Sequence, residues 1–247
     1  MIEMADWNDW HDIDIDDFVI LNKHRVRLKR WFEGPVSGMP HILLLGDYGT
    51  GKTSVARMIM KAFNWQRIVE IDASNENARS MKKLVDEHFS ATRRATLEGF
   101  FGTSEKSTRS LYFYDEFHNI SSEIQGIFHV PLERGKEFSC AIFATNDLNR
   151  SRSGGLDSRC RVINMGVTGN KGEKAEIEKQ MVTFGSVLLK HFDADDGTVT
   201  KTKLKELAKI NFVERSDGTF SHDVRSFVQN VEDAYKDAKF EVGGKDD

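Results

Sequence analysis

A glycine-rich stretch with one lysine and one threonine is the part of this 247-residue chain most suited to chemistry. Residues 46–53 read Gly-Asp-Tyr-Gly-Thr-Gly-Lys-Thr and match the pattern G-x-x-x-x-G-K-[ST] at every fixed position. Such a turn directs successive backbone N–H groups at one point, where a following helix N-terminus also favours an anion. A lysine here reaches the outer phosphates of a nucleotide, and the threonine hydroxyl binds Mg²⁺.

The residues on either side supply the elements that such a loop needs. Residues 41–45 form a short apolar run typical of a buried parallel strand, and residues 54–63 have apolar side chains at helical spacing. An ordinary glycine turn after a strand is the weaker alternative, because both the template and its flanks match. The residues that we expect to contact the nucleotide are Gly46, Asp47, Tyr48, Gly49, Thr50, Gly51, Lys52, Thr53 and Ser54.

A second apolar run, Leu111-Tyr112-Phe113-Tyr114, is followed by two acidic residues, Asp115 and Glu116. Ligands of parallel sheets bind at the carboxyl ends of the strands. We expect Asp115 to hold Mg²⁺ through water, because this hard cation prefers oxygen ligands. We expect Glu116 to polarise the water that attacks the γ-phosphate. A strand that merely ends in exposed acids is the alternative.

Asn146 and Arg159 are the next candidates. Asn146 ends the apolar run 140–146, where a neutral amide can orient water without competing for Mg²⁺, although asparagine is also a common turn residue. Arg159 leads into the last expected strand and cannot easily reach its own nucleotide. It could stabilise charge on the nucleotide of a neighbouring subunit, but taken alone it is better explained as an exposed loop arginine.

The composition is that of a globular protein, with 39% hydrophobic and 30% charged residues. No apolar run is long enough to span a membrane, and the N-terminus lacks a signal peptide pattern. Two cysteines form neither a disulfide framework nor a metal-site spacing, which favours a reducing compartment. We therefore expect no membrane association and no secretion, and a cytoplasmic location (the host cytoplasm for a phage protein) or a nuclear one in a eukaryote. The net charge of −4 argues against wholesale coating of nucleic acid but permits a local basic surface.

Apolar runs and helical patterns alternate up to Gly166, and only helical patterns follow it. Strands are expected at 41–45, 67–74, 111–116, 140–146 and 161–166, which predicts an α/β fold with a doubly wound parallel sheet. Ser74 or Asn75 is expected to cap a helix that follows, and Pro131 to interrupt a helix over 121–134. The expected domains are an α/β nucleotide-binding domain over 1–167, a helical domain without strands over 168–240, and a flexible tail over 241–247.

In their order, these motifs resemble those of the AAA+ ATPases, specifically the small ATPase subunits of DNA polymerase clamp loaders of the phage, archaeal and replication-factor-C type. The segments MPHILLLGDYGTGKTS (39–54), EIDASNENARSM (70–81) and GGLDSRCRVINMG (154–166) carry the resemblance, which covers about residues 10–235. It implies a five-stranded parallel P-loop sheet flanked by helices and followed by a small helical lid domain. Asp47-Tyr48 stands where the family has two prolines.

The resemblance also implies roles for individual residues. Arg159, in Ser158-Arg159-Cys160, matches an arginine that acts in trans on the neighbour's ATP. Arg225 matches the lid arginine that contacts the phosphates, and Phe18, Val19 and Ile20 fall where adenine is contacted. Arg79, Lys82 and Lys83, with the amides of their helix N-terminus, would follow the DNA backbone, the alternative being a solvated helix face.

The resemblance implies an ATP- and Mg²⁺-dependent clamp-loader subunit. Together with other loader subunits it would open a sliding clamp and place it on primer–template DNA, and hydrolysis would release the loader. The family's helical collar domain has no counterpart in these residues, so a truncated chain, a separate collar chain and a different assembly stay open. Two alternatives are a helicase loader or branch-migration motor, with Phe100 and Phe101 in a pore loop, and an ATP-switched DNA-binding scaffold, which would have no need of Glu116.

Overall fold

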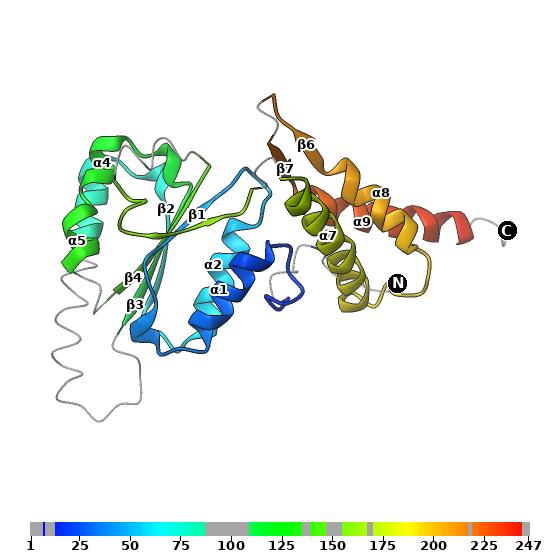
Figure 1. Cartoon of the computed structure of the whole chain (residues 1–247), viewed down its shortest axis with the longest axis horizontal. Coiled ribbons are helices and arrows are strands. Elements are labelled where there is room, and N and C mark those ends of the chain that lie inside the picture. Colours follow the sequence, from blue (N-terminus) through cyan, green and yellow to red (C-terminus); the bar gives the residue numbers. More distant parts are fainter. Residues whose placement is uncertain are drawn as a thin grey trace. The chain divides into compact units, whose positions relative to one another are not determined.

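The central element is a five-stranded sheet in which all strands run parallel, in the order β2-β3-β4-β1-β5 (Figure 1). The strands are β1 (Ile42–Leu45), β2 (Ile68–Asp72), β3 (Ser110–Asp115), β4 (Ser139–Thr145) and β5 (Arg161–Asn164). The computed structural model describes residue 7 and residues 13–86, 109–134, 139–146, 155–166, 170–216 and 219–243. The parallel five-stranded sheet expected from the sequence is confirmed.

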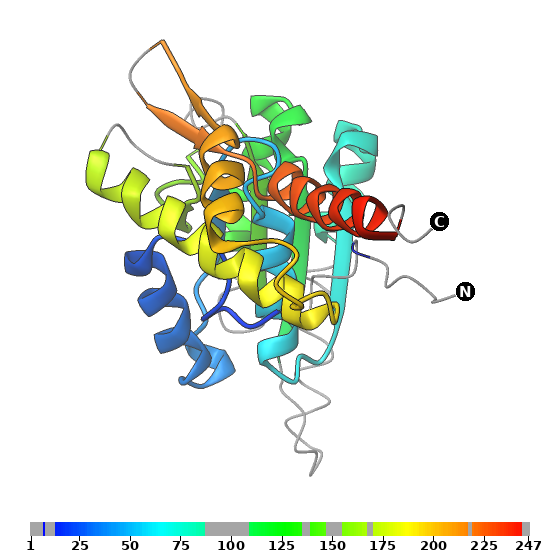
Figure 2. The same ribbon diagram turned by 90° about the vertical axis from the view of Figure 1, so that its right-hand side faces the viewer.

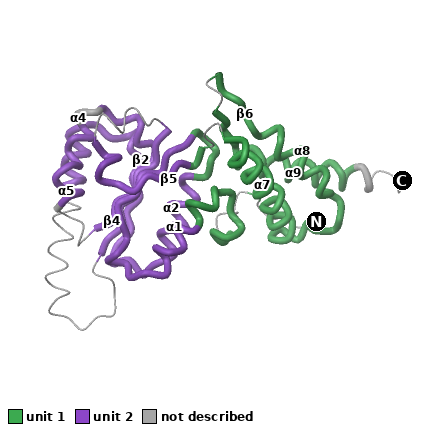
Figure 3. Tube along the Cα trace, viewed as in Figure 1, with its two compact units in different colours: residues 1–25, 47–51, 165–247 green, residues 26–46, 52–164 purple. Residues whose placement is uncertain are grey.

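The chain divides into two compact units (Figure 3). Residues 26–46 and 52–164 form what we call the sheet unit, and residues 1–25, 47–51 and 165–247 form the helical unit. The domain boundary near residue 167 stays a prediction.

Aromatic residues dominate one side of the sheet. Tyr114 of β3 stacks on Phe143 of β4 with ring centroids 5.1 Å apart, and Phe117 and Phe128 meet Phe143 edge-on at 4.7 and 5.3 Å. These four rings, which we call the aromatic cluster, are each at most 1% exposed. Offset and edge-to-face pairs of this kind add about 0.5–1.5 kcal/mol beyond their buried area. The cluster therefore fixes the turn that follows β3.

Helices cover both sides of the sheet. They are α1 (Asn22–Phe32), α2 (Lys52–Ala62), a helical run over 78–86, α4 (Ser122–Gly126) and α5 (His129–Arg134), with 3₁₀ turns η2 (Val36–Gly38), η3 (Ala73–Asn75) and η4 (Phe117–Asn119). The expected cap at Ser74 or Asn75 is wrong, because Asn77 Oδ1 accepts the backbone N–H groups of Arg79 and Ser80. Pro131 lies in the first turn of α5, which tolerates proline, so the break comes before it, between α4 and α5.

The helical unit contains α7 (Lys171–His191), α8 (Lys201–Ile210) and α9 (Val224–Gly243) (Figure 2). A Cβ on Gly185 of α7 would lie 2.8 Å from Leu204 of α8, so this glycine permits close packing of the two helices. A short antiparallel hairpin, β6 (Phe212–Glu214) with β7 (Phe220–His222), joins α8 to α9. The expectation of no strand after Gly166 is therefore wrong, since three-residue strands carry too little periodicity to be read. No helix in the described part of the chain has the length and apolar character to cross a membrane.

Candidate nucleotide-binding site

The glycine-rich loop joins β1 to α2, as the sequence predicts. Gly49 and Gly51 have φ angles of +76° and +88°, in the left-handed region that favours glycine. The Thr50 hydroxyl, fully buried, donates to the Asp47 carbonyl at 2.9 Å. Lys52 is the first residue of α2, so the loop leads directly into a helix N-terminus, where free amides and the helix dipole favour an anion.

The ammonium group of Lys52 lies beside Gly46, the first residue of the glycine-rich pattern. Lys52 is only 7% exposed, and its Nζ donates to the Gly46 carbonyl at 2.8 Å. Burying a charge is costly unless polar or charged partners compensate it. An anionic phosphate at this position would be such a partner for the ammonium group.

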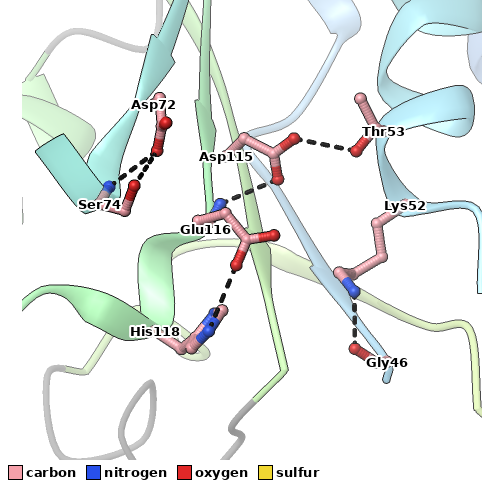
Figure 4. Close-up of polar contacts among 8 residues, drawn as sticks. All are labelled: Gly46, Lys52, Thr53, Asp72, Ser74, Asp115, Glu116 and His118. Carbon is pink, nitrogen blue, oxygen red and sulfur yellow. Dashed lines mark hydrogen bonds and ion pairs between the residues drawn. The ribbon is translucent and has the colours of Figure 1, made fainter. Parts of the chain in front are cut away.

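Two oxygen donors face each other beside the loop. The Thr53 hydroxyl donates to Asp115 Oδ2 at 2.9 Å, and Asp115 Oδ1 accepts the Glu116 backbone N–H at 2.9 Å (Figure 4). A hydroxyl and a carboxylate are the hard oxygen ligands that Mg²⁺ prefers, usually together with substrate phosphates and water. Within the described ranges, no group of three or more His, Cys, Asp or Glu side chains is arranged to hold a metal. One hydroxyl and one carboxylate fit a Mg²⁺ ion whose other ligands are substrate phosphates and water.

Glu116 adopts an unusual backbone conformation. Its φ of 52° and ψ of 34° place it in the left-handed region, which costs a non-glycine residue about 1–2 kcal/mol. Strained residues of this kind cluster at active sites. Its carboxylate is partly exposed, and Oε2 lies 3.3 Å from His118 Nε2 (Figure 4).

Asn146 follows β4 at the same edge of the sheet. Leu45 of β1 is in register with Thr145, and the Gly46 N–H donates to the Thr145 carbonyl at 3.2 Å. Asn146 therefore lies next to the start of the phosphate loop. Both polar atoms of its amide are buried, and neither has a hydrogen-bond partner among the described residues. Unsatisfied buried groups are rare in proteins, and an amide of this kind is available to a ligand or an ordered water.

Two further polar residues at this edge escaped the sequence reasoning. Asp72 ends β2 in register with Asp115, and its carboxylate accepts Ser74 N–H at 2.9 Å and Ser74 Oγ–H at 2.6 Å. These hydrogen bonds hold the pKa of Asp72 below its usual value. His118 is the second. The available signals were an acid near the end of the strand expected over 67–74 and a histidine two positions after Glu116.

In the helical unit, the start of α9 contacts loop residues 47–51. The Val224 N–H donates to the Gly49 carbonyl at 2.9 Å, and the Asp223 carboxylate accepts Ser226 N–H and Oγ–H at 2.9 and 2.7 Å. A Cβ on Gly49 would lie 2.0 Å from Asp223 Oδ1, so only glycine permits this approach. Arg225 N–H lies 3.4 Å from the same carbonyl, and its side chain is exposed.

Asp47 and Tyr48 have different surroundings. Asp47 forms an ion pair with Arg215, whereas the Tyr48 side chain is 64% exposed. The Val19 and Ile20 side chains are buried in the helical unit, and the Ile20 N–H donates to Gln180 Oε1 at 2.8 Å. Their expected contact with adenine stays a prediction.

Arg159 lies at the opposite edge of the sheet from the phosphate loop. It precedes β5, whose four residues span about 13 Å, whereas the loop, Asp115 and Asn146 follow the strands that carry them. Its guanidinium bonds to Glu133 at 2.7 Å and to the Gly155 carbonyl at 2.9 Å. With Arg109 and Arg161 it lines a cleft of about 420 Å³. The structure does not bring Arg159 to the phosphate loop of its own sheet.

The residues expected to contact DNA share one exposed helix face. Arg79, Lys82 and Lys83 are exposed, whereas Met81 and Val85 of the same turns are buried. Two N-terminal amides of this helix already donate to Asn77, so they are not free. Phe100 and Phe101 lie outside the described residues.

One family model matches the segment that carries these residues. A family model described as "ATPase family associated with various cellular activities (AAA)" matches residues 42–163, which include β1, the phosphate loop, Asp115, Asn146 and the first three residues of β5. Residues 42–163 correspond to an AAA ATPase domain. ATP binding and hydrolysis are the activities that define this class.

Two relatives of this chain are named as replication factor C small subunits. The chain is 26% identical over 149 residues to a protein named as a replication factor C small subunit of Acanthamoeba polyphaga mimivirus, covering 58% of this chain and 42% of that one. It is 29% identical over 112 residues to the replication factor C small subunit of Thermoplasma volcanium, covering 44% and 32%. The AAA chain thus spans less than half the length of either relative.

Solved structures agree on the fold. A RuvB variant of Thermotoga maritima superposes with a TM-score of 0.55 at 18% identity, covering 89% of this chain and 63% of that one. Cdc6p of Pyrobaculum aerophilum gives a TM-score of 0.55 at 16% identity, covering 94% and 67%. At these identities the likeness establishes the AAA+ fold and nothing about substrates.

Proposed function

We propose that this AAA ATPase binds ATP with Mg²⁺ and serves as a clamp-loader subunit, with hydrolysis completed by an adjoining subunit. The observation that carries the proposal is the division of polar and charged side chains between the two ends of the strands of one sheet. Lys52, Asp115 and Asn146 gather at the carboxyl edge, whereas Arg159 lies at the amino edge. A nucleotide bound at one edge would therefore need its arginine from another molecule.

Each residue of the site has a separate role in the proposed hydrolysis of ATP. Lys52 neutralises the outer phosphates, and the loop amides bind their oxygens. Thr53 and Asp115 would hold Mg²⁺, which supplies charge neutralisation of the phosphates when bound. Glu116 accepts the proton of the attacking water, and the Asn146 amide orients that water. Val19, Ile20 and Arg225 are proposed to contact the base and the phosphates.

The partners are proposed from the relatives. Their name, replication factor C small subunit, supports an assembly with other loader subunits, a sliding clamp and primer–template DNA. Arg79, Lys82 and Lys83 offer the exposed basic face for the DNA backbone. Contacts of this kind carry no sequence information and weaken with salt.

Complementation between two defective variants tests the trans arrangement. Arg159→Ala and Glu116→Gln should each bind ATP and each fail to turn it over. In a random mixture, about one site in four combines an intact Glu116 with a neighbour's intact Arg159, so activity should return. A mixture as inactive as its components would refute the trans assignment.

A loading assay tests the wider role. Primed circular DNA and a candidate clamp should stimulate ATP turnover, and the clamp should remain on the DNA after the ATPase has left. Turnover that ignores both additions would refute the clamp-loader proposal. A hexamer in native mass spectrometry would favour a motor instead, and binding without turnover would favour an ATP-switched scaffold.

A further inference from the structure

The imidazole of His118 lies against the carboxylate of Glu116. His118 Nε2 is 3.3 Å from Glu116 Oε2, and both residues belong to the sheet unit. An ionised carboxylate can only accept, so the nitrogen that faces it must carry the proton. The distance is slightly longer than a usual N–H···O bond of about 2.7–3.2 Å, within the range of an ion pair.

Core packing fixes the place of this imidazole. His118 is the middle residue of η4, in which the Asn119 N–H donates to the Glu116 carbonyl at 3.0 Å. Its neighbour Phe117 belongs to the aromatic cluster, with ring centroids 4.7 Å from Phe143 and 5.4 Å from Phe128. Because Phe117 is anchored in the core, the turn directs the His118 ring back over Glu116.

The carboxylate itself has more freedom than its backbone. The left-handed conformation and the N–H bond to Asp115 fix the Glu116 main chain, but three side-chain torsions still separate it from the carboxylate. Figure 4 shows one carboxylate oxygen facing His118 and the other pointing away from it, toward the side on which Lys52 is drawn. A contact on one oxygen thus leaves the second oxygen available.

We propose that His118 is a positioning residue, which holds one oxygen of Glu116 so that the other accepts the proton of the attacking water. This inference rests on the ATP hydrolysis proposed above. In that step the water oxygen bonds to the γ-phosphorus, the bond from the γ-phosphorus to the bridging oxygen breaks, and that oxygen leaves with ADP. The water proton passes to Glu116 and then to solvent, while His118 keeps its own. A base oriented by a third group is a recurring arrangement in enzymes.

Three substitutions at one position separate orientation from packing. His118→Ala removes the donor, His118→Gln retains an N–H at the reach of Nε2, and His118→Asn offers one only at the shorter reach of Nδ1. We expect the Ala and Asn variants to lower kcat on the order of tenfold, since a base contributes about 10²–10⁴-fold and remains present. The Gln variant should keep most of the wild-type kcat. The KM and the Kd for ATP should stay within about twofold in all three.

His191→Ala is the matched control, because it removes an exposed imidazole at the end of α7, in the helical unit. Its kcat should equal that of the wild type. If wild-type protein hydrolyses ATP and Glu116→Gln does not, the proposed function stands and the His118 variants decide the inference alone. A normal or raised kcat in His118→Ala, a Gln variant as slow as Ala, or a loss of ATP binding that accounts for the effect would overturn it. A wild type without turnover would overturn both.

Discussion

Acidification should destabilise the helical unit through one buried histidine. His222 lies in β7, opposite Phe212, and is 1% exposed. Neither ring nitrogen has a hydrogen-bond partner among the described residues. Burial lowers the pKa of His222 from 6.5 to about 4, and the nearby charges of Asp223 and Asp47 oppose this shift.

The sign and size follow from linkage. The folded pKa lies below the unfolded one, so between about pH 6.5 and pH 4 the unfolded chain binds more protons. Lowering the pH through this window therefore favours unfolding. With these two pKa values, the free energy of unfolding falls by about 2 kcal/mol between pH 7.5 and pH 5, and by about 3 kcal/mol below both values.

Urea unfolding of the wild type and of His222→Phe, followed by circular dichroism, measures this loss. Phenylalanine keeps a ring against Phe212, cannot be protonated and abandons no hydrogen bond. The two proteins share every other titrating group, so the difference between their pH dependences isolates His222. We expect the wild type to lose about 2 kcal/mol more than the variant between pH 7.5 and pH 5. Equal losses in the two proteins would refute the reasoning.

Three other substitutions have defined outcomes. Gly49→Ala should weaken ATP binding at least tenfold in calorimetry, because the added Cβ would strike Asp223. The control Gly197→Ala has a similar φ of +83° but no atom within 4 Å, so it should cost about 1 kcal/mol of stability and leave the ATP affinity unchanged. Equal ATP affinities of the two variants would contradict the close approach of Gly49 and Asp223. Arg109→Met should lower the free energy of unfolding, measured in urea, by about 3 kcal/mol. The reason is that the buried guanidinium donates to the carbonyls of Val36, Met39 and Ser139 at 2.6–2.8 Å. A loss below about 1 kcal/mol would show that these carbonyls find other donors. Glu133→Gln should raise the ATP turnover of the assembled ATPase about two- to fivefold, because it frees Arg159 from a partly exposed ion pair. The control Glu178→Gln breaks the 3.9 Å pair with Lys174 and should leave ATP turnover unchanged. Slower turnover in Glu133→Gln would mean that the ion pair aligns Arg159 instead.

The sheet could be predicted because its strands are short apolar runs that turn-forming and charged residues separate from one another. Each of the five observed strands lies within about two residues of the expected run, and the phosphate loop follows from a template whose glycines have a backbone requirement. The hairpin of β6 and β7 could not be predicted, since three residues per strand leave no period to detect.

The missed site residues have a different cause. His118 and Asp72 lie beside Glu116 and Asp115 only because a 3₁₀ turn and a strand register place them there. The contact of Asp223 with Gly49 joins positions 174 residues apart in sequence, which no local pattern encodes. Tertiary placement rather than residue type was the missing information.

The position of Arg159 at the amino edge of the sheet makes each protomer directional. One end presents a guanidinium and the other a phosphate loop, so under the proposed trans arrangement contacts between copies would run head to tail. An open row of such copies leaves one loop at its end without an arginine, whereas a closed ring leaves none. Turnover per protomer would therefore rise as an open row lengthens and would reach its ceiling only when the row closes on itself.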